Sequence, residues 1–95
     1  MRPVLMTDLL CAGRAVLAVD PQARAPLARR LLRDADAADR FLRRYGARHP
    51  RFGDGTLAAA ARHSGLVSDP AICDPEFARA LVLVLHALIH RAQSD

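Results

Sequence analysis

The sequence predicts an all-α fold, a single domain over residues 1–95 built as a small bundle of about four helices. Apolar residues recur three and four positions apart in two long stretches, 26–45 and 75–92. Proline, glycine and capping residues separate these stretches from shorter helical patterns. The run of branched residues at 81–85 resembles a strand, but the length of the stretch and its start at Pro75 and Glu76 favour a helix.

The first expected helix covers residues 8–19, with Thr7 as its cap. Asp20 and Pro21 end it, because proline restricts the residue before it and cannot continue the backbone ladder. Pro26 then predicts a short turn over residues 21–25, so the long second helix is expected to begin at residue 26. Gly46 is expected to stop that helix in a left-handed conformation.

The second helix carries the most regular apolar pattern of the chain. Its members alternate three and four apart, as in the seam of a coiled coil, and small members allow close approach of another helix. We therefore predict an oligomer or partner interface along this seam, made by Ala28, Leu31, Ala35, Ala38, Leu42 and Tyr45.

The opposite face of this helix is rich in arginine. Spacings of four residues predict ion pairs between Asp36 and Arg40 and between Asp39 and Arg43. Tyr45 and Phe52 are close enough in sequence to stack on a base or to pack inward, and we expect at least one of them to pack inward. The predicted DNA contacts are arginines of this helix and of the following loop, namely Arg29, Arg33, Arg40, Arg44, Arg48 and Arg51.

A loop is expected over residues 46–55, followed by a short helix over 56–63 and a fourth helix over 75–92. The fourth helix is apolar nearly all the way round, so it must be buried on most sides. Either the other helices of a tight bundle bury the fourth helix, or another protomer or partner protein buries the part that they leave exposed. The partner interface is accordingly expected to include Leu85, Leu88 and Ile89.

No residue pattern in the chain predicts an enzyme. His86 and His90 have a spacing that suits two ligands of one metal ion, but a closed site needs two more, so no metal or other cofactor is expected. Cys11 and Cys73 are expected to be reduced and buried. The turn before Thr56 suits an anion at a helix N-terminus, or, as we favour, a simple capping turn.

The net charge is +4, and all fourteen basic residues are arginine. Arginine suits phosphate contacts because its planar group can bind two oxygens, but the same composition also arises in GC-rich genomes. Without base-reading geometry, such a surface predicts weak, salt-sensitive, sequence-independent binding of double-stranded DNA. No signal peptide or membrane-length apolar run is apparent, so the chain is expected to be cytoplasmic, with no membrane contact.

Four segments together resemble a family of short alphaproteobacterial proteins. They are MRPVL at 1–5, RLL at 30–32 together with ADAADR at 35–40, HPRFGDGTLAAA at 49–60 and DPEFARALVLVLHAL at 74–88. Members of that family accompany the large terminase of gene transfer agents and related prophages. The resemblance implies a small terminase, a non-catalytic subunit that binds DNA and recruits it to the large terminase, the packaging motor. It further implies a homo-oligomer, although this chain lacks the separate helix-turn-helix domain that many small terminases carry.

Two other classes of function stay open at this point. A small transcription regulator or anti-regulator, acting through protein–protein contact, would need the same apolar surface on the fourth helix. A small enzyme or metal-dependent module using His86, His90 and Cys73 would instead need bound metal and a polar pocket.

Overall fold

The computed structural model describes residues 1–94 and confirms the all-α fold. The described chain forms four helices: α1 (Met6–Leu17), α2 (Pro21–Tyr45), α3 (Leu57–Ser64) and α4 (Pro75–Ser94). Two irregular segments join α2 to α3 and α3 to α4. No described helix is both long and apolar enough to span a bilayer.

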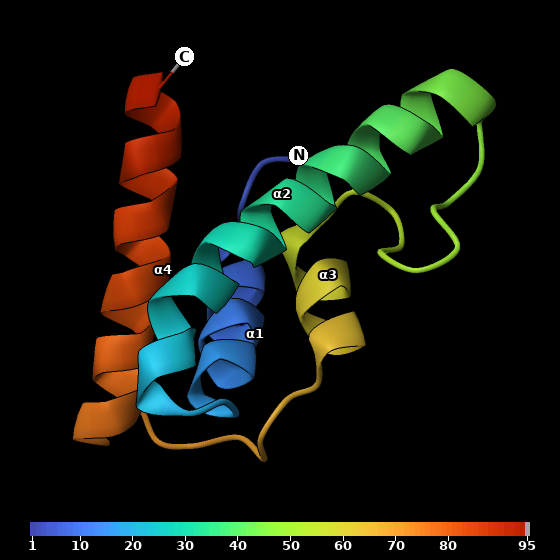
Figure 1. Ribbon diagram of the computed structural model, residues 1–95. Helices are drawn as coiled ribbons and strands as arrows, with labels where there is room; N and C mark the ends of the chain where they lie inside the picture. The colour runs from blue at the N-terminus through green and yellow to red at the C-terminus, as the bar shows by residue number, and fades with distance from the viewer. Residues whose placement is uncertain (95) are drawn as a thin grey trace.

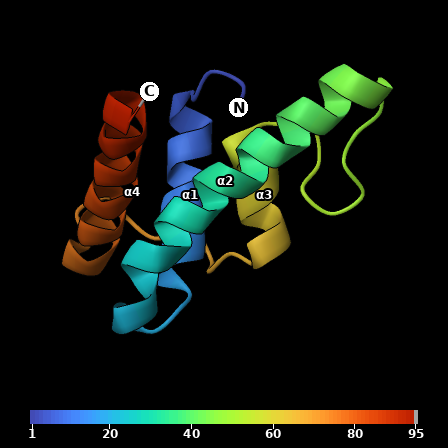
Figure 2. The same ribbon diagram turned by 45° about the horizontal axis from the view of Figure 1, so that its top comes forward.

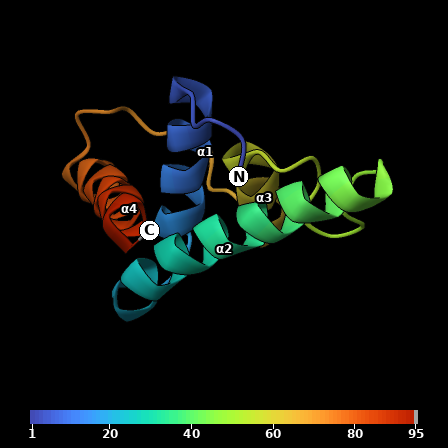
Figure 3. The same cartoon turned by 90° about the horizontal axis from the view of Figure 1, so that it is seen from above.

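Helix α1 lies at the centre of the bundle, between α4 on one side and α3 on the other (Figures 1 and 3). Helix α2 crosses the bundle and contacts all three other helices. Its C-terminal turns project beyond them, together with the loop that leads back to α3 (Figure 2). This arrangement leaves one long side of α2 facing away from the bundle.

The core is built largely from small side chains of all four helices. Phe77, Leu31, Leu57, Val16 and Val84 are its largest fully buried members. A Cβ atom on the buried Gly13 would lie 2.6 Å from Leu81 Cδ2, so glycine here lets α4 approach α1 closely. Close packing of this kind makes the core sensitive to added volume.

The first helix begins earlier than expected, and its cap is not Thr7. It starts at Met6, and Asp8 accepts a hydrogen bond from the backbone N–H of Leu5 at 2.9 Å. The second carboxylate oxygen of the buried Asp8 accepts from the N–H of Ala58 at 3.0 Å. One carboxylate therefore satisfies backbone donors at the starts of both α1 and α3, where helix dipoles favour negative charge.

The second helix is continuous from Pro21, so the expected turn over residues 21–25 is wrong. Pro26 lies inside the helix but is exposed, and the carbonyl that it leaves without a donor belongs to the exposed Gln22. Arg24 helps to fix the start of α2, because its Nε donates to the Val19 carbonyl at 3.1 Å. Its Nη2 also donates to the Leu17 carbonyl at 3.3 Å, which satisfies acceptors at the end of α1.

The remaining helix ends follow the sequence patterns closely. Gly46 ends α2 with φ of 69°, the left-handed conformation expected there. Thr56 caps α3 by accepting from the N–H of Ala59, and Asp54 in turn accepts from the hydroxyl of Thr56. The turn is thus a capping device, as favoured above. Helix α4 extends two residues past the expected end at residue 92.

We predict that Asp8→Ala lowers the free energy of unfolding by about 2–3 kcal/mol, because two backbone donors lose their buried acceptor. Urea denaturation followed by circular dichroism measures this loss. Asp20→Ala is the matched control, since Asp20 precedes α2 but makes no side-chain capping hydrogen bond. Equal destabilisation by the two substitutions would contradict the bridging role of Asp8.

Candidate functional site

Four exposed arginines form a stripe along the side of α2 that faces away from the bundle. At 100° per residue, their positions fall within roughly 60° of one another around the helix axis. The first and the last of them are fifteen positions apart, so the stripe is about 22 Å long. The stripe consists of Arg29, Arg33, Arg40 and Arg44.

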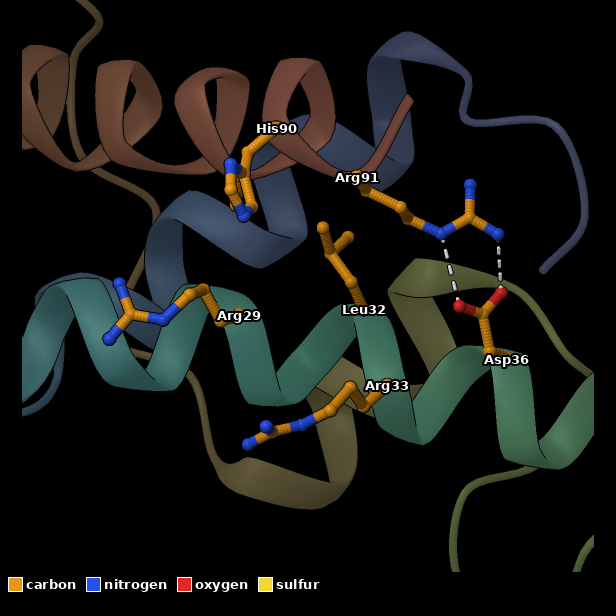
Figure 4. A pocket seen from close by; sticks show the side chains of 7 residues that line it. Arg29, Leu32, Arg33, Asp36, His90 and Arg91 are labelled. Atoms are coloured by element: carbon orange, nitrogen blue, oxygen red, sulfur yellow. Dashed lines mark hydrogen bonds and ion pairs between the residues drawn. The ribbon is translucent and has the colours of Figure 1, made fainter. Parts of the chain in front are cut away.

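The carboxylates of α2 pair with cations that are not members of the stripe. Asp39 pairs with Arg43 at 2.9 Å, as expected. The expected pair between Asp36 and Arg40 is absent, because Asp36 lies at the edge nearest α4 and takes two hydrogen bonds from Arg91, at 2.6 and 3.0 Å (Figure 4). Within the described chain, no stripe arginine has an ion pair.

Asp36 also binds the N-terminal amino group of the chain, beside its contact with Arg91. Its Oδ1 accepts from the Met1 amino group at 2.7 Å, and Asp39 lies 3.2 Å from that group. Burial alone would raise the pKa of Asp36, but the hydrogen bonds from Arg91 and the amino group lower it below the ordinary value of 3.8. The ionised carboxylate therefore stabilises the contact between α2 and α4.

Arg48 and Arg51 lie in the loop beyond the stripe, and both are exposed. Arg51 sits over the Phe52 ring at 5.7 Å from its centroid. Hydrogen bonding by Thr56 is the main cause that lowers the pKa of Asp54, and the charges of Arg2 and Arg48 contribute. Arg48 is thus partly offset by a neighbouring carboxylate, whereas the stripe arginines are not.

The loop itself is held by aromatic contacts. His49 stacks on Phe52 at 4.9 Å between ring centroids and meets Phe41 edge-on at 5.0 Å. Its Nδ1 accepts from the backbone N–H groups of Arg51 and Phe52, at 3.0 and 3.1 Å. Phe52 therefore packs against the loop, while Tyr45, 61% exposed, keeps an accessible ring beside Arg44.

Most of the predicted seam on α2 is buried in the chain's own core. Leu42 is half-buried and Tyr45 is exposed, but the other four members are covered by this chain's own helices. The four covered residues are Ala28, Leu31, Ala35 and Ala38, each no more than 1% exposed.

Helix α4 has a second seam on its outer side, distinct from the buried one. Val82, Leu85 and Ile89 are 46, 43 and 55% exposed. Ala78 and Ala92 extend them with the same alternating spacing of four and three. Leu88, by contrast, is partly buried against the core. A helical wheel drawn with the buried Phe77, Ala80, Val84 and Ala87 as the inner side would have separated the two seams.

The histidines of α4 and the two cysteines do not come together in one site. His86 and His90 line one hollow between α2 and α4, together with Arg29. Among residues 1–94, no three potential ligands of the histidine, cysteine and carboxylate types converge on one point. Cys11 is buried as expected, whereas Cys73 is exposed in the segment before α4, so the expectation for Cys73 is wrong.

The lowered pKa of Asp36 predicts a specific pH dependence. A folded-state pKa below the unfolded value adds stability above about pH 4, and this stability is lost as the pH falls through the folded-state pKa. The unfolding free energy of the wild type should therefore exceed that of Asp36→Asn at pH 6, and the gap should shrink towards pH 2.5. Urea titrations at both pH values measure it, with Asp34→Asn as control. A gap that stays constant would contradict the assignment.

Comparisons with known proteins place the chain in a family. No curated protein matches it. No solved structure matches it either. A family model described as a domain of unknown function, DUF7742, matches residues 2–88, which include all of α1, α2 and α3 and most of α4. The chain therefore belongs to the DUF7742 family.

Proposed function

We propose that this protein is a small-terminase-type adaptor that binds double-stranded DNA through α2 and delivers it to a packaging ATPase. The arginine stripe of α2 is the observation that carries the proposal. The resemblance of four sequence segments to small terminases of gene transfer agents supports the packaging role. The adaptor is non-catalytic in this proposal, needs no cofactor and works in the cytoplasm.

The stripe suits the phosphate backbone of a duplex. Its four cations lie at intervals of four, seven and four residues along about 22 Å of one helix side, which offers a line of charge. The ion pairs of Asp34 with Arg30 and of Asp39 with Arg43 leave the stripe's own charge available. Contacts of this kind bind without reading sequence, and each lost contact flattens the salt dependence.

The outer seam of α4 suits association with further protein. Val82, Leu85 and Ile89 stand on one exposed side of a single helix, as expected for a helix that packs on another. In the proposal this seam joins copies of the chain, and the large terminase contacts the assembled oligomer. Oligomerisation would also place several arginine stripes on one DNA molecule, which raises weak affinity by multivalency.

The same seam supports a second candidate, a transcription regulator or anti-regulator that acts by protein–protein contact. This candidate predicts a one-to-one complex with a transcription protein, in place of self-association and DNA retention. Co-purification followed by mass spectrometry separates the two. Recovery of the packaging ATPase favours the adaptor, and recovery of polymerase or a response regulator favours the alternative.

We predict that the triple variant Arg33→Gln, Arg40→Gln, Arg44→Gln loses most DNA binding. Three phosphate contacts contribute about 2.7 to the slope of log affinity against log salt, so the slope should flatten by about that amount. Fluorescence anisotropy with a labelled 30-base-pair duplex, at several salt concentrations, measures affinity and slope together.

The matched control removes three exposed arginines that lie away from the stripe, Arg2, Arg62 and Arg79, each replaced by glutamine. Both triple variants carry the same net charge, so a bulk charge effect would weaken them equally. We expect the control to retain nearly the wild-type slope. Equal losses in the two variants would contradict a localised DNA contact.

We predict that Ile89→Glu weakens self-association at least about tenfold, because a charge would be buried in the seam. Ile89 is more than half exposed, so the fold should survive. Analytical ultracentrifugation over a concentration series measures the change. Ile72→Glu is the control, since Ile72 is 63% exposed in the segment before α4. A wild type that stays monomeric, or equal effects of both variants, would contradict the seam's role.

A further inference from the structure

A continuous groove runs between the N-terminal half of α2 and the length of α4. It consists of three adjoining hollows of about 190, 440 and 370 Å³. The first two share Arg29, Ala87 and His90, and the last two share Leu83 and His86. We call this the α2–α4 groove. It adjoins the stripe and shares Arg29 and Arg33 with it, but its other wall comes from α4.

The groove combines an apolar floor with cationic walls. Leu32, Leu83 and Ala87 contribute to the floor. Figure 4 shows Leu32 pointing from α2 towards α4 and His90 pointing from α4 towards α2, at one end of the groove. Arg29 stands on the α2 side, and Arg79 with His86 stands on the α4 side.

The charge of the groove is one-sided. Asp36 is the single acid among the described residues that line the three hollows, and Arg91 pairs with it. Arg29, Arg33 and Arg79 therefore leave an excess of positive charge that no lining carboxylate offsets. The complementary ligand must be anionic along its edges.

The apolar floor decides which anionic ligand fits. A DNA duplex is too wide to enter a groove between two packed helices, and phosphates gain nothing from leucine and alanine side chains. An amphipathic helix places apolar residues every third or fourth position against such a floor, with acidic residues on both flanks. Charge complementarity and the shape of the floor thus favour a peptide over a nucleic acid.

We propose that the α2–α4 groove docks an acidic amphipathic helix of a partner protein. Leucine-sized side chains of that helix fill the hollows over Leu83 and Ala87. Its flanking carboxylates meet Arg29 on one wall and Arg79 on the other. This proposal goes beyond DNA binding and does not depend on it, because the floor and the Arg79 wall lie outside the stripe, and Arg40 and Arg44 line none of the three hollows.

The test uses a labelled 15-residue helical peptide, with leucines three and four apart and glutamates on both flanks. Anisotropy titration of the full chain should give saturable binding. A peptide with glutamine in place of glutamate should bind at least about tenfold more weakly, because its flanks lose the charge that complements the walls. Absence of saturable binding by the acidic peptide, or equal binding of the two peptides, would overturn the proposal.

Two variants locate the site. Arg79→Glu reverses one wall charge and should weaken acidic-peptide binding at least about tenfold. Arg40→Glu makes the same charge change on the stripe, outside the groove, and should alter it less than about twofold. Both residues are exposed, and circular dichroism verifies that both variants fold. Equal weakening by the two would place the peptide on the general basic surface and overturn the groove assignment.

A further variant tests the groove without changing any charge. Ala25 lines the middle hollow, so Ala25→Phe fills part of it and should weaken the acidic peptide at least about fivefold. Competition with a 20-base-pair duplex completes the test. The duplex shares only Arg29 and Arg33 with the groove, so it should displace the peptide only in part. Complete displacement by DNA, together with unchanged binding to Ala25→Phe, would show a nucleic-acid surface instead.

Discussion

The amphipathic character of α2 is the constraint on which the rest of the molecule depends. One side of this helix presents Ala28, Leu31, Ala35 and Ala38, whose burial joins it to the other three helices. The arginines lie on the opposite side of the helix, so burying the apolar side in the core points the arginines towards solvent. The stripe and one wall of the groove are therefore two consequences of the same packing.

Charged groups inside the bundle are accommodated by specific partners. Asp8 is buried, but its oxygens receive backbone N–H groups from the starts of α1 and α3. Asp36 joins α2 to α4 through Arg91, and Arg24 joins α2 to the end of α1 through the Leu17 carbonyl. These contacts fix the helix orientations that place the outer side of α2 and the groove where they are. In a chain of 95 residues, with a core made mostly of small side chains, such contacts carry a large share of the specificity.

Much of the fold follows from local sequence, since Gly46, Thr56 and Pro75 mark helix ends by backbone chemistry alone. Local patterns did not predict the continuity of α2 through Pro26, which depends on the exposure of that turn in the folded chain. The sequence could predict that the arginines are exposed, because they lie opposite an apolar seam. It could not predict what covers that seam, because the spacing of Leu31 and Ala35 is the same whether a helix packs within its own chain or on another. The partner of Asp36 was missed for a related reason: Arg91 lies fifty-five residues away in sequence.

The central claim is that DNA lies along the outer side of α2. The most direct measurement is NMR of the arginine side-chain Nε–Hε groups while a DNA duplex is added. The account predicts shifts at Arg33, Arg40 and Arg44, while Arg24 and Arg91, which are engaged inside the bundle, keep their positions. Shifts concentrated at Arg2, Arg62 and Arg79, or no shifts at any arginine, would contradict it.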